Sequence, residues 1–116
     1  ELGLQCEAHA LAMDKRIVNS DGVSVSSYES HHGYANTAGG EGYLHSTRHS
    51  ISCSLIAKEG EEMRRDYDYT TARDAKDLVS TDVVAQTAVQ RTLSRLGSRQ
   101  IETQETPVIF SSRVSS

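Results

Sequence analysis

The chain has no tryptophan, one phenylalanine and one proline among its 116 residues. Hydrophobic residues make up 36% of the sequence and aromatic residues 5%. Because burial of large apolar side chains is the main force for folding, a chain of this length and composition builds only a modest core. We therefore expect one unit, residues 1–116, that is a segment of a longer protein. Some of its apolar surface would then be buried against neighbouring parts of that protein.

The chain also lacks an excess of positive charge. Twelve lysines and arginines stand against 16 acidic residues, for a formal net charge of −4, so we expect no direct contact with nucleic acid. No apolar run approaches membrane-spanning length, and nothing is typical of a signal peptide, so we expect no membrane contact. Two cysteines, Cys6 and Cys53, lie in different expected elements. A disulfide between them stays open, but we favour free thiols in a reducing cytosol.

Helical periodicity occurs at two places. Residues 1–13 have apolar or small side chains on one stripe of an expected amphipathic helix, at Leu4, Ala8, Leu11 and Ala12. A second helix is expected near residues 81–96, capped by Ser80 or Thr81 and stopped by Gly97. Its apolar stripe consists of Ala85, Val89, Leu93 and Leu96.

The sequence between the helices has the two-residue period of strands. A short strand at 16–19 is expected to close in a turn at Ser20–Asp21–Gly22, because Asp-Gly is a strong reversal signal. "VSVSSYESHHGYANT" then predicts a strand with one wet face, and an interruption at Gly33 stays open. "AGGEG" predicts a hairpin turn, and the alternation from Tyr43 to Ala57 predicts a half-buried antiparallel strand.

Two further strands complete the expected fold. After a turn at "KEGE", the stretch "EMRRDYDYT" alternates as a third long strand, and "VIF" after Pro107 predicts a last short one. The predicted class is α+β, with an antiparallel sheet of several long strands, an N-terminal helix and a second helix near residues 81–96.

The stretch "YLHSTRHSISC" raises the question of a metal site. On a strand, four steps separate His45 from His49 by roughly 13 Å, too far for one ion that binds nitrogen at about 2 Å. Ser46 also stands where the HExxH motif has its general base. A cross-strand site stays open, because a hairpin centred near Gly39–Gly40 would bring His31 or His32 opposite residues 47–49.

The weak metal candidates are therefore His31, His32 and His49. We favour the simpler interpretation that these histidines lie on a polar sheet face, and assign no catalytic, cofactor-binding or metal-binding residue. Cys53 lies between the same-face neighbours Ile51 and Leu55, which is typical of a buried inert thiol, and Cys6 is interpreted in the same way.

Two charged stretches have alternative interpretations. "RRDYDY" is either a polar recognition face or a solvated strand whose Arg–Asp pairs contribute little. In "RTLSRLGSR", basic residues at a helix C-terminus are explained by the helix dipole, and phosphate contact is the less favoured alternative.

Four segments, in order, resemble the PmbA/TldD family and specifically its PmbA (also called TldE) branch. They are "CEAHALAMDKRIVNSDG", "YLHSTRHSISCSLIA", "MRRDYDYTTARDAKDL" and "RTLSRLGSRQIETQETPVIF". The resemblance implies the central segment of a longer protein. It also implies a cytoplasmic metallopeptidase complex with a TldD-type subunit, which acts on unfolded or small peptides, matures a microcin and degrades an antitoxin. The family also bears the older label "modulator of DNA gyrase".

In this family the TldD-type subunit has an HExxxH motif that supplies zinc ligands, and PmbA-type subunits lack it. No His-Glu pair occurs anywhere in this sequence. The resemblance therefore implies no cofactor in this segment and zinc only in a TldD-type partner subunit. Whether the segment takes part in catalysis stays open.

We expect a non-catalytic segment that presents extended peptides, in a heterodimer with a TldD-type subunit or in a homodimer. One alternative is an autonomous metal-dependent peptidase with a cross-strand histidine site. The other is a regulator that interacts with DNA gyrase.

Overall fold

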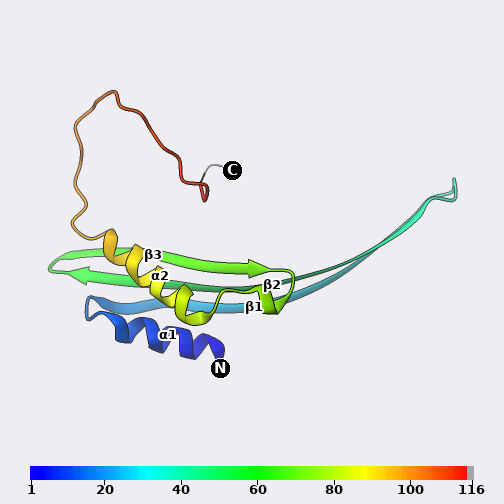
Figure 1. Ribbon diagram of the computed structural model, residues 1–116, viewed down its shortest axis with the longest axis horizontal. Coiled ribbons are helices and arrows are strands. Elements are labelled where there is room, and N and C mark those ends of the chain that lie inside the picture. Colours follow the sequence, from blue (N-terminus) through cyan, green and yellow to red (C-terminus); the bar gives the residue numbers. More distant parts are fainter. Residues whose placement is uncertain (115–116) are drawn as a thin grey trace.

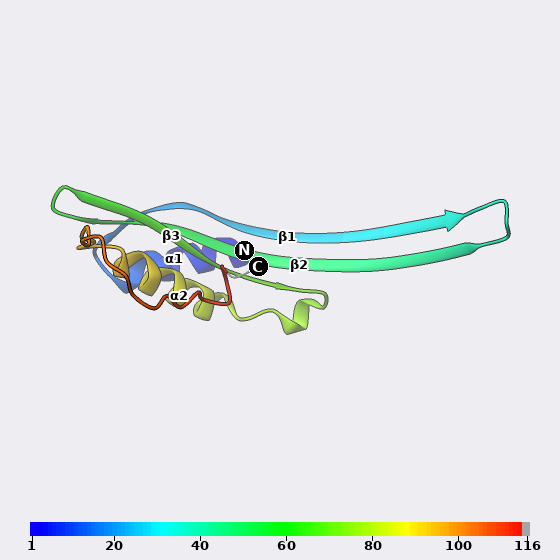
Figure 2. The same cartoon turned by 90° about the horizontal axis from the view of Figure 1, so that it is seen from above.

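The computed structural model describes residues 1–114, which form two α-helices, one 3-10 turn and a three-stranded antiparallel sheet (Figure 1). The elements are α1 (Leu2–Met13), β1 (Ile17–Ala35), β2 (Glu41–Glu59), β3 (Glu62–Ala72), η1 (Ala75–Asp77) and α2 (Thr81–Ser94). The strand order is β1-β2-β3, and both helices lie on the same face of the sheet (Figure 2). The predicted α+β class is confirmed.

The core lies between the two helices and the odd-numbered positions of β2. Ile51, Cys53, Leu55 and Ala57 are all buried, as the alternation predicted. The stripe predicted for α2 is also confirmed, because Ala85 and Val89 are buried and Leu93 and Leu96 pack against the core. Most buried side chains are small, with Leu55 heading the fully buried ones by volume. The core is thin because the sequence contains few large apolar residues.

The face of α1 that packs on the core is opposite to the predicted one. Cys6 and Ala10 are fully buried, whereas Leu4 is 72% exposed and Leu11 39% exposed. Leu4, Ala8, Leu11 and Ala12 therefore form a stripe that nothing in residues 1–114 covers. The reason is steric: α1 packs against both α2 and the sheet, and small side chains permit that close approach. The helix is apolar on both sides, so its sequence pattern alone does not indicate which side is inward.

The predicted turn at Ser20–Asp21–Gly22 is wrong. β1 runs without a break from Ile17 to Ala35, and neither this stretch nor Gly33 interrupts it. Instead, the pairing of β1 with β2 shifts twice, between Ile17 and Asn19 and between Ser20 and Gly22. Gly22 has φ +118°, a backbone angle that glycine adopts readily and that fits a β-bulge. Asp21–Gly22 therefore lies at a bulge within a long strand. It does not reverse the chain, because β1 stays paired with β2 on both sides of it.

The far half of the β1–β2 hairpin has no third strand. β3 ends at Ala72, which pairs with His49, so residues 28–48, here called the hairpin arm, form a two-stranded ribbon with its turn (Figure 1). The turn lies where "AGGEG" predicted it, and Asn36 Oδ1 accepts hydrogen bonds from the backbone of Ala38 and Gly40. The arm gives the molecule a longest extent of 66 Å.

The last predicted strand, "VIF" after Pro107, is also wrong. Residues 98–111 have no regular secondary structure, and Val108, Ile109 and Phe110 are 67%, 95% and 71% exposed. A strand needs a neighbouring edge with free backbone groups. On the edge strand β3, side chains occupy both backbone groups of Tyr67.

Candidate functional site

The even-numbered residues of β3 turn two carboxylates toward the helices. Asp66 pairs with Leu55 and Asp68 with Cys53, so both carboxylates are on the core side of the sheet. They are 7% and 8% exposed. The sequence interpretations of "RRDYDY" included neither burial nor a structural role for these aspartates, because acidic residues on a short alternating strand are usually solvated.

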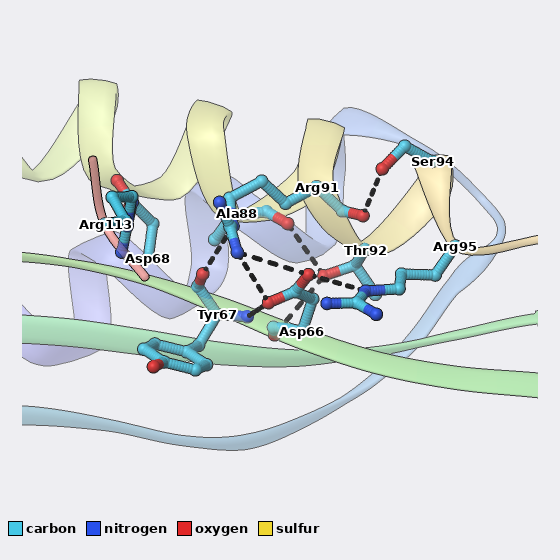
Figure 3. A network of polar contacts seen from close by, with 9 residues as sticks. All are labelled: Asp66, Tyr67, Asp68, Ala88, Arg91, Thr92, Ser94, Arg95 and Arg113. Carbon is cyan, nitrogen blue, oxygen red and sulfur yellow. Dashed lines mark hydrogen bonds and ion pairs between the residues drawn. The ribbon is translucent and has the colours of Figure 1, made fainter. Parts of the chain in front are cut away.

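Two arginines of the last helical turns reach Asp66 (Figure 3). Arg95 Nε donates to Asp66 Oδ2 at 2.9 Å, and Arg91 contacts both carboxylate oxygens at 3.2 and 3.4 Å. The backbone N–H of Tyr67 also donates to Asp66, at 2.8 Å. Burial by itself raises the pKa of Asp66, but these hydrogen bonds outweigh it and the pKa is lowered overall. The basic run "RTLSRLGSR" therefore holds α2 on the sheet.

Asp66 and Arg91 also occupy part of the free edge of β3. The N–H of Tyr67 is bonded to Asp66 and its carbonyl oxygen accepts from Arg91 Nε at 2.9 Å, so this outward residue has no free backbone group. Arg113 forms an ion pair with Asp68, and its guanidinium lies 4.9 Å from the ring centre of Tyr69. Within residues 1–114, β1 is the other edge strand of the sheet, and no strand pairs with its outer side.

The sheet face opposite the helices carries tyrosines. Tyr67 and Tyr69 are 51% and 48% exposed, and their rings stack with centres 6.3 Å apart. No helix in residues 1–114 covers this face, which is formed by the alternate positions of the three strands (Figure 2), and Arg113 lies over the Tyr69 ring at its β3 edge. Tyrosine offers an apolar body and a hydrogen-bonding end, which suits a contact surface.

The structure pairs the histidines differently from the expected hairpin register. His31 lies opposite His45, His32 opposite Leu44, and His49 opposite Ser27. The expected register, with His31 or His32 opposite residues 47–49, is therefore wrong, because the ladder closes at Ala35 and Glu41. The open question of a contact with His49 is answered too, since Ser27 lies opposite His49. His32 Nε2 lies 2.6 Å from Ser30 Oγ, and His49 Nδ1 lies 2.9 Å from Ser27 Oγ.

His31 and His45 share a carboxylate. Nε2 of His45 lies 2.8 Å from Glu29 Oε1, and Nε2 of His31 lies 3.2 Å from the same oxygen. The two imidazole rings stack with centres 4.4 Å apart at 15°. Hydrogen bonds from His45 and His31 lower the pKa of Glu29. Sequence reasoning placed neither Glu29 nor His45 in a cross-strand site, because their proximity depends on the register.

The two cysteines are buried free thiols, as expected. Burial, together with the neighbouring Cys6, raises the pKa of Cys53 to about 12. Burial raises the pKa of Cys6 as well, although a hydrogen bond from Cys53 opposes this. A thiol with a raised pKa carries little thiolate at neutral pH and is a poor nucleophile. Neither cysteine is a candidate for covalent chemistry.

The fold described above is that of a domain from a metallopeptidase family. The family model for the PmbA/TldA metallopeptidase central domain matches residues 1–96, and the chain belongs to this family. It is 43% identical over 115 residues to "Metalloprotease PmbA" of Escherichia coli O157:H7, covering 98% of this chain and 25% of that protein. It is 38% identical over 115 residues to "Metalloprotease PmbA homolog" of Buchnera aphidicola (subspecies Acyrthosiphon pisum), covering 99% of this chain and 26% of that protein.

A solved structure has the same fold. It is that of a proposed modulator of DNA gyrase from Bacteroides thetaiotaomicron, with a TM-score of 0.78 and 27% identity over 87% of this chain and 23% of that one. The resemblance to the PmbA branch is thus confirmed. The chain spans about a quarter of the length of the curated relatives it matches. None of the helices in residues 1–114 is long and apolar enough to cross a membrane.

Members of this family are named metalloproteases, which raises the question whether side chains of this chain could bind a metal ion. Within residues 1–114, Glu29, His31 and His45 have ligand atoms that all lie within 4.8 Å of one another. Two imidazoles and a carboxylate are a donor set that zinc accepts. The cluster contains no second carboxylate to act as a general base, however. It fits a bound ion but not a peptidase centre.

Proposed function

We propose that this chain is a non-catalytic, substrate-presenting segment of a PmbA-type subunit, which acts with a TldD-type subunit in a cytoplasmic metallopeptidase complex. A homodimer is the other arrangement that the proposal accommodates. In either arrangement the segment contributes surface for an extended peptide, and the zinc that hydrolyses the peptide bond belongs to the TldD-type subunit. This role would serve proteolysis and the maturation of peptides such as a microcin.

The open edge of β1 is the observation that carries the proposal. A 19-residue edge strand offers backbone N–H and C=O groups that can pair with an extended peptide by strand addition. Such pairing recognises backbone rather than side chains, which suits a peptidase for unfolded or small peptides. The other edge of the sheet supports the same choice, since Asp66 and Arg91 occupy the N–H and the carbonyl oxygen of Tyr67 in its middle.

The helix-free face supports docking of a second subunit. It carries the tyrosine pair Tyr67–Tyr69 next to Ser52 and Ser54, their partners on β2. Aromatic residues in an otherwise polar surface are favoured at protein–protein interfaces. We therefore assign the TldD-type subunit to this face and the peptide to the β1 edge.

The test is a reconstitution with full-length PmbA-type and TldD-type subunits and a fluorogenic peptide. We expect little cleavage by the PmbA-type subunit alone and strong cleavage by the pair. Loss of a histidine from the HExxxH motif of the TldD-type subunit should abolish it. A peptide N-methylated at alternate residues away from the scissile bond should have a raised KM, because it cannot pair along its length. Equal cleavage by the PmbA-type subunit alone would overturn the proposal.

A second candidate, an autonomous metal-dependent peptidase, is favoured by the cluster of Glu29, His31 and His45. It predicts that metal-loaded full-length protein cleaves peptides without a partner and that His45→Ala removes this activity. The cluster lacks a general base, so we place this candidate second.

A further inference from the structure

The hairpin arm holds two histidines and a glutamate that the peptide-presenting function does not use. Their ligand atoms lie within 4.8 Å of one another. We propose that Glu29, His31 and His45 bind a divalent transition-metal ion of the zinc type, and that the ion clips the two strands of the hairpin arm together.

The register of the hairpin creates the cluster. His31 and His45 are directly opposite each other on β1 and β2, and Glu29 is two residues before His31 on the same face of the ribbon. Directly paired residues have Cβ atoms roughly 5 Å apart, close enough for two imidazoles to reach one ion. The ligands thus come from both strands, and a shift of the register by one residue would separate them.

The donor spacing is close to what an ion needs. Two donors about 2.1 Å from a tetrahedral zinc ion lie roughly 3.4 Å apart. Nε2 of His45 and of His31 lie 2.8 Å and 3.2 Å from Glu29 Oε1. Widening the two distances to the carboxylate by a few tenths of an ångström would bring them to that spacing, and the donor atoms of all three side chains already lie within 4.8 Å of one another. The carboxylate that now accepts from both imidazoles would then become a ligand beside them.

The chemistry of the donors selects the type of ion. Imidazole nitrogens favour zinc and its neighbours in the transition series, whereas calcium and magnesium favour oxygen ligands. Three protein ligands leave a fourth tetrahedral position for water or for a group from a neighbouring surface.

A contact behind His31 supports the same assignment. Nδ1 of His31 is hydrogen-bonded to the hydroxyl of Tyr43. When the hydroxyl oxygen accepts from Nδ1–H, Nε2 presents its lone pair to the ion, as outer partners do at established zinc sites. Nε2 of His31 and Nε2 of His45 both lie within hydrogen-bond distance of Glu29 Oε1, so both face that carboxylate. The two rings stack at 15°, and one of them turns when both lone pairs meet at one ion.

The position of the cluster gives the ion its role. The hairpin arm has two strands and no third, and a two-stranded ribbon by itself is marginally stable in water. An ion bound to His31 on β1 and to His45 on β2 would cross-link these strands beyond the end of β3. The site is structural in this proposal and does not depend on the peptide-presenting role.

The experiment measures zinc content and backbone exchange in the full-length protein. Metal-stripped protein is dialysed against micromolar Zn2+, and bound zinc is measured by mass spectrometry for wild type, Glu29→Gln, His31→Ala and His45→Ala. His32→Ala and His49→Ala are matched controls, because each removes an imidazole from the same hairpin but outside the cluster. Hydrogen exchange of residues 28–48 is then measured with and without Zn2+.

We expect wild type and both controls to bind one more equivalent of zinc than His31→Ala and His45→Ala. Glu29→Gln should weaken binding at least tenfold, because an uncharged amide is a poor ligand. Zinc should slow exchange in residues 28–48 severalfold in wild type and leave it unchanged in His45→Ala. Equal zinc content in all six proteins, or an equal loss in His49→Ala, would overturn the site. Zinc uptake without slower exchange would overturn the clip.

Circular dichroism and thermal unfolding keep the comparison interpretable. The three ligands are exposed, so their variants should fold as the wild type does without zinc. The result is separate from the proposed function, since peptide cleavage by the reconstituted pair is not measured here.

Discussion

Asp66 carries a charge although it is only 7% exposed, and its surroundings explain why that is tolerated. Arg91, Arg95 and the N–H of Tyr67 all donate to its carboxylate. A buried carboxylate without such donors would cost several kcal/mol of stability, because its charge would be removed from water without compensation. The network also joins α2 to the edge of the sheet.

Acidification should reveal this network. The pKa of Asp66 is lowered in the folded chain, so its contribution is fully present above the ordinary aspartate pKa of about 4 and is lost as pH falls through the lowered folded value. We expect Asp66→Asn to cost about 2 kcal/mol at pH 7 and to flatten the loss of stability as the pH falls below about 4.

Urea unfolding at a series of pH values measures both effects. Asp21→Asn is the control, because Asp21 pairs with Arg65 at an exposed position and should cost less than about 1 kcal/mol. An Asp66→Asn variant with the wild-type acid slope would contradict the role assigned to this carboxylate.

The thiols give a second test at this scale. Burial raises the pKa of Cys53 to about 12 and that of Cys6 in the same direction. We therefore expect neither to react with a disulfide reagent at pH 8 in the folded chain, and both to react after unfolding in guanidinium. Rapid labelling of the folded chain would show that α1 opens readily from the sheet.

The helices and strands differ in how well their sequence predicts which side chains face the core and which residues pair. The two-residue period of β2 correctly indicated which side chains are inward, and the α2 stripe did the same for its helix. The register of the hairpin could not be obtained from alternation, because a shift by two residues preserves the pattern. The turn geometry set by Asn36 fixes it, and with it the meeting of His31 and His45. Burial of Asp66 was unpredictable for a similar reason, since its arginine partners are 25 and 29 residues away.

α1 shows a different limit of sequence reasoning. It has apolar residues on two opposite sides, and packing against α2 chooses the side with the smaller ones, Cys6 and Ala10. The exposed side with Leu4 and Leu11 would have been the better choice by hydrophobicity alone.

Substitution of a buried and an exposed leucine tests which side of α1 faces the core. Leu55 is fully buried and Leu4 is 72% exposed. We expect Leu55→Ala to lower the free energy of unfolding by about 2–5 kcal/mol, and Leu4→Ala to change it by less than about 0.5 kcal/mol. Denaturant unfolding of the 116-residue chain measures both. A large effect of Leu4→Ala would mean that the predicted stripe is inward after all.

At the scale of the whole molecule, stability is concentrated at one end. Both helices and all three strands overlap around residues 51–57 of β2, whereas the hairpin arm has neither helix nor third strand beside it (Figure 1). Local opening should therefore be much easier in the arm.

Hydrogen exchange of the 116-residue chain checks this. Without added metal, we expect amides of residues 41–48 to exchange at least tenfold faster than those of residues 51–57, although both belong to β2. Equal protection along the strand would show that a second molecule covers the arm. Dilution of the sample would then distinguish that case.

The two pairing shifts at the base of β1 have a consequence for how this stretch can change. Ile17 pairs with Ala57, Ser20 with Leu55 and Val23 with Cys53, so the paired residue numbers sum to 74, then 75, then 76. The two shifts together change the sum by two, an even number, and Ile17 and Val23 both face the core. Each shift is one extra residue of β1 that a bulge absorbs. Deleting one residue between Ile17 and Val23 would remove one shift and deleting two would remove both, while Ile17 could still pair with Ala57 and Val23 with Cys53. Related proteins that are one or two residues shorter in this stretch should therefore keep the same side chains of β1 on the core side.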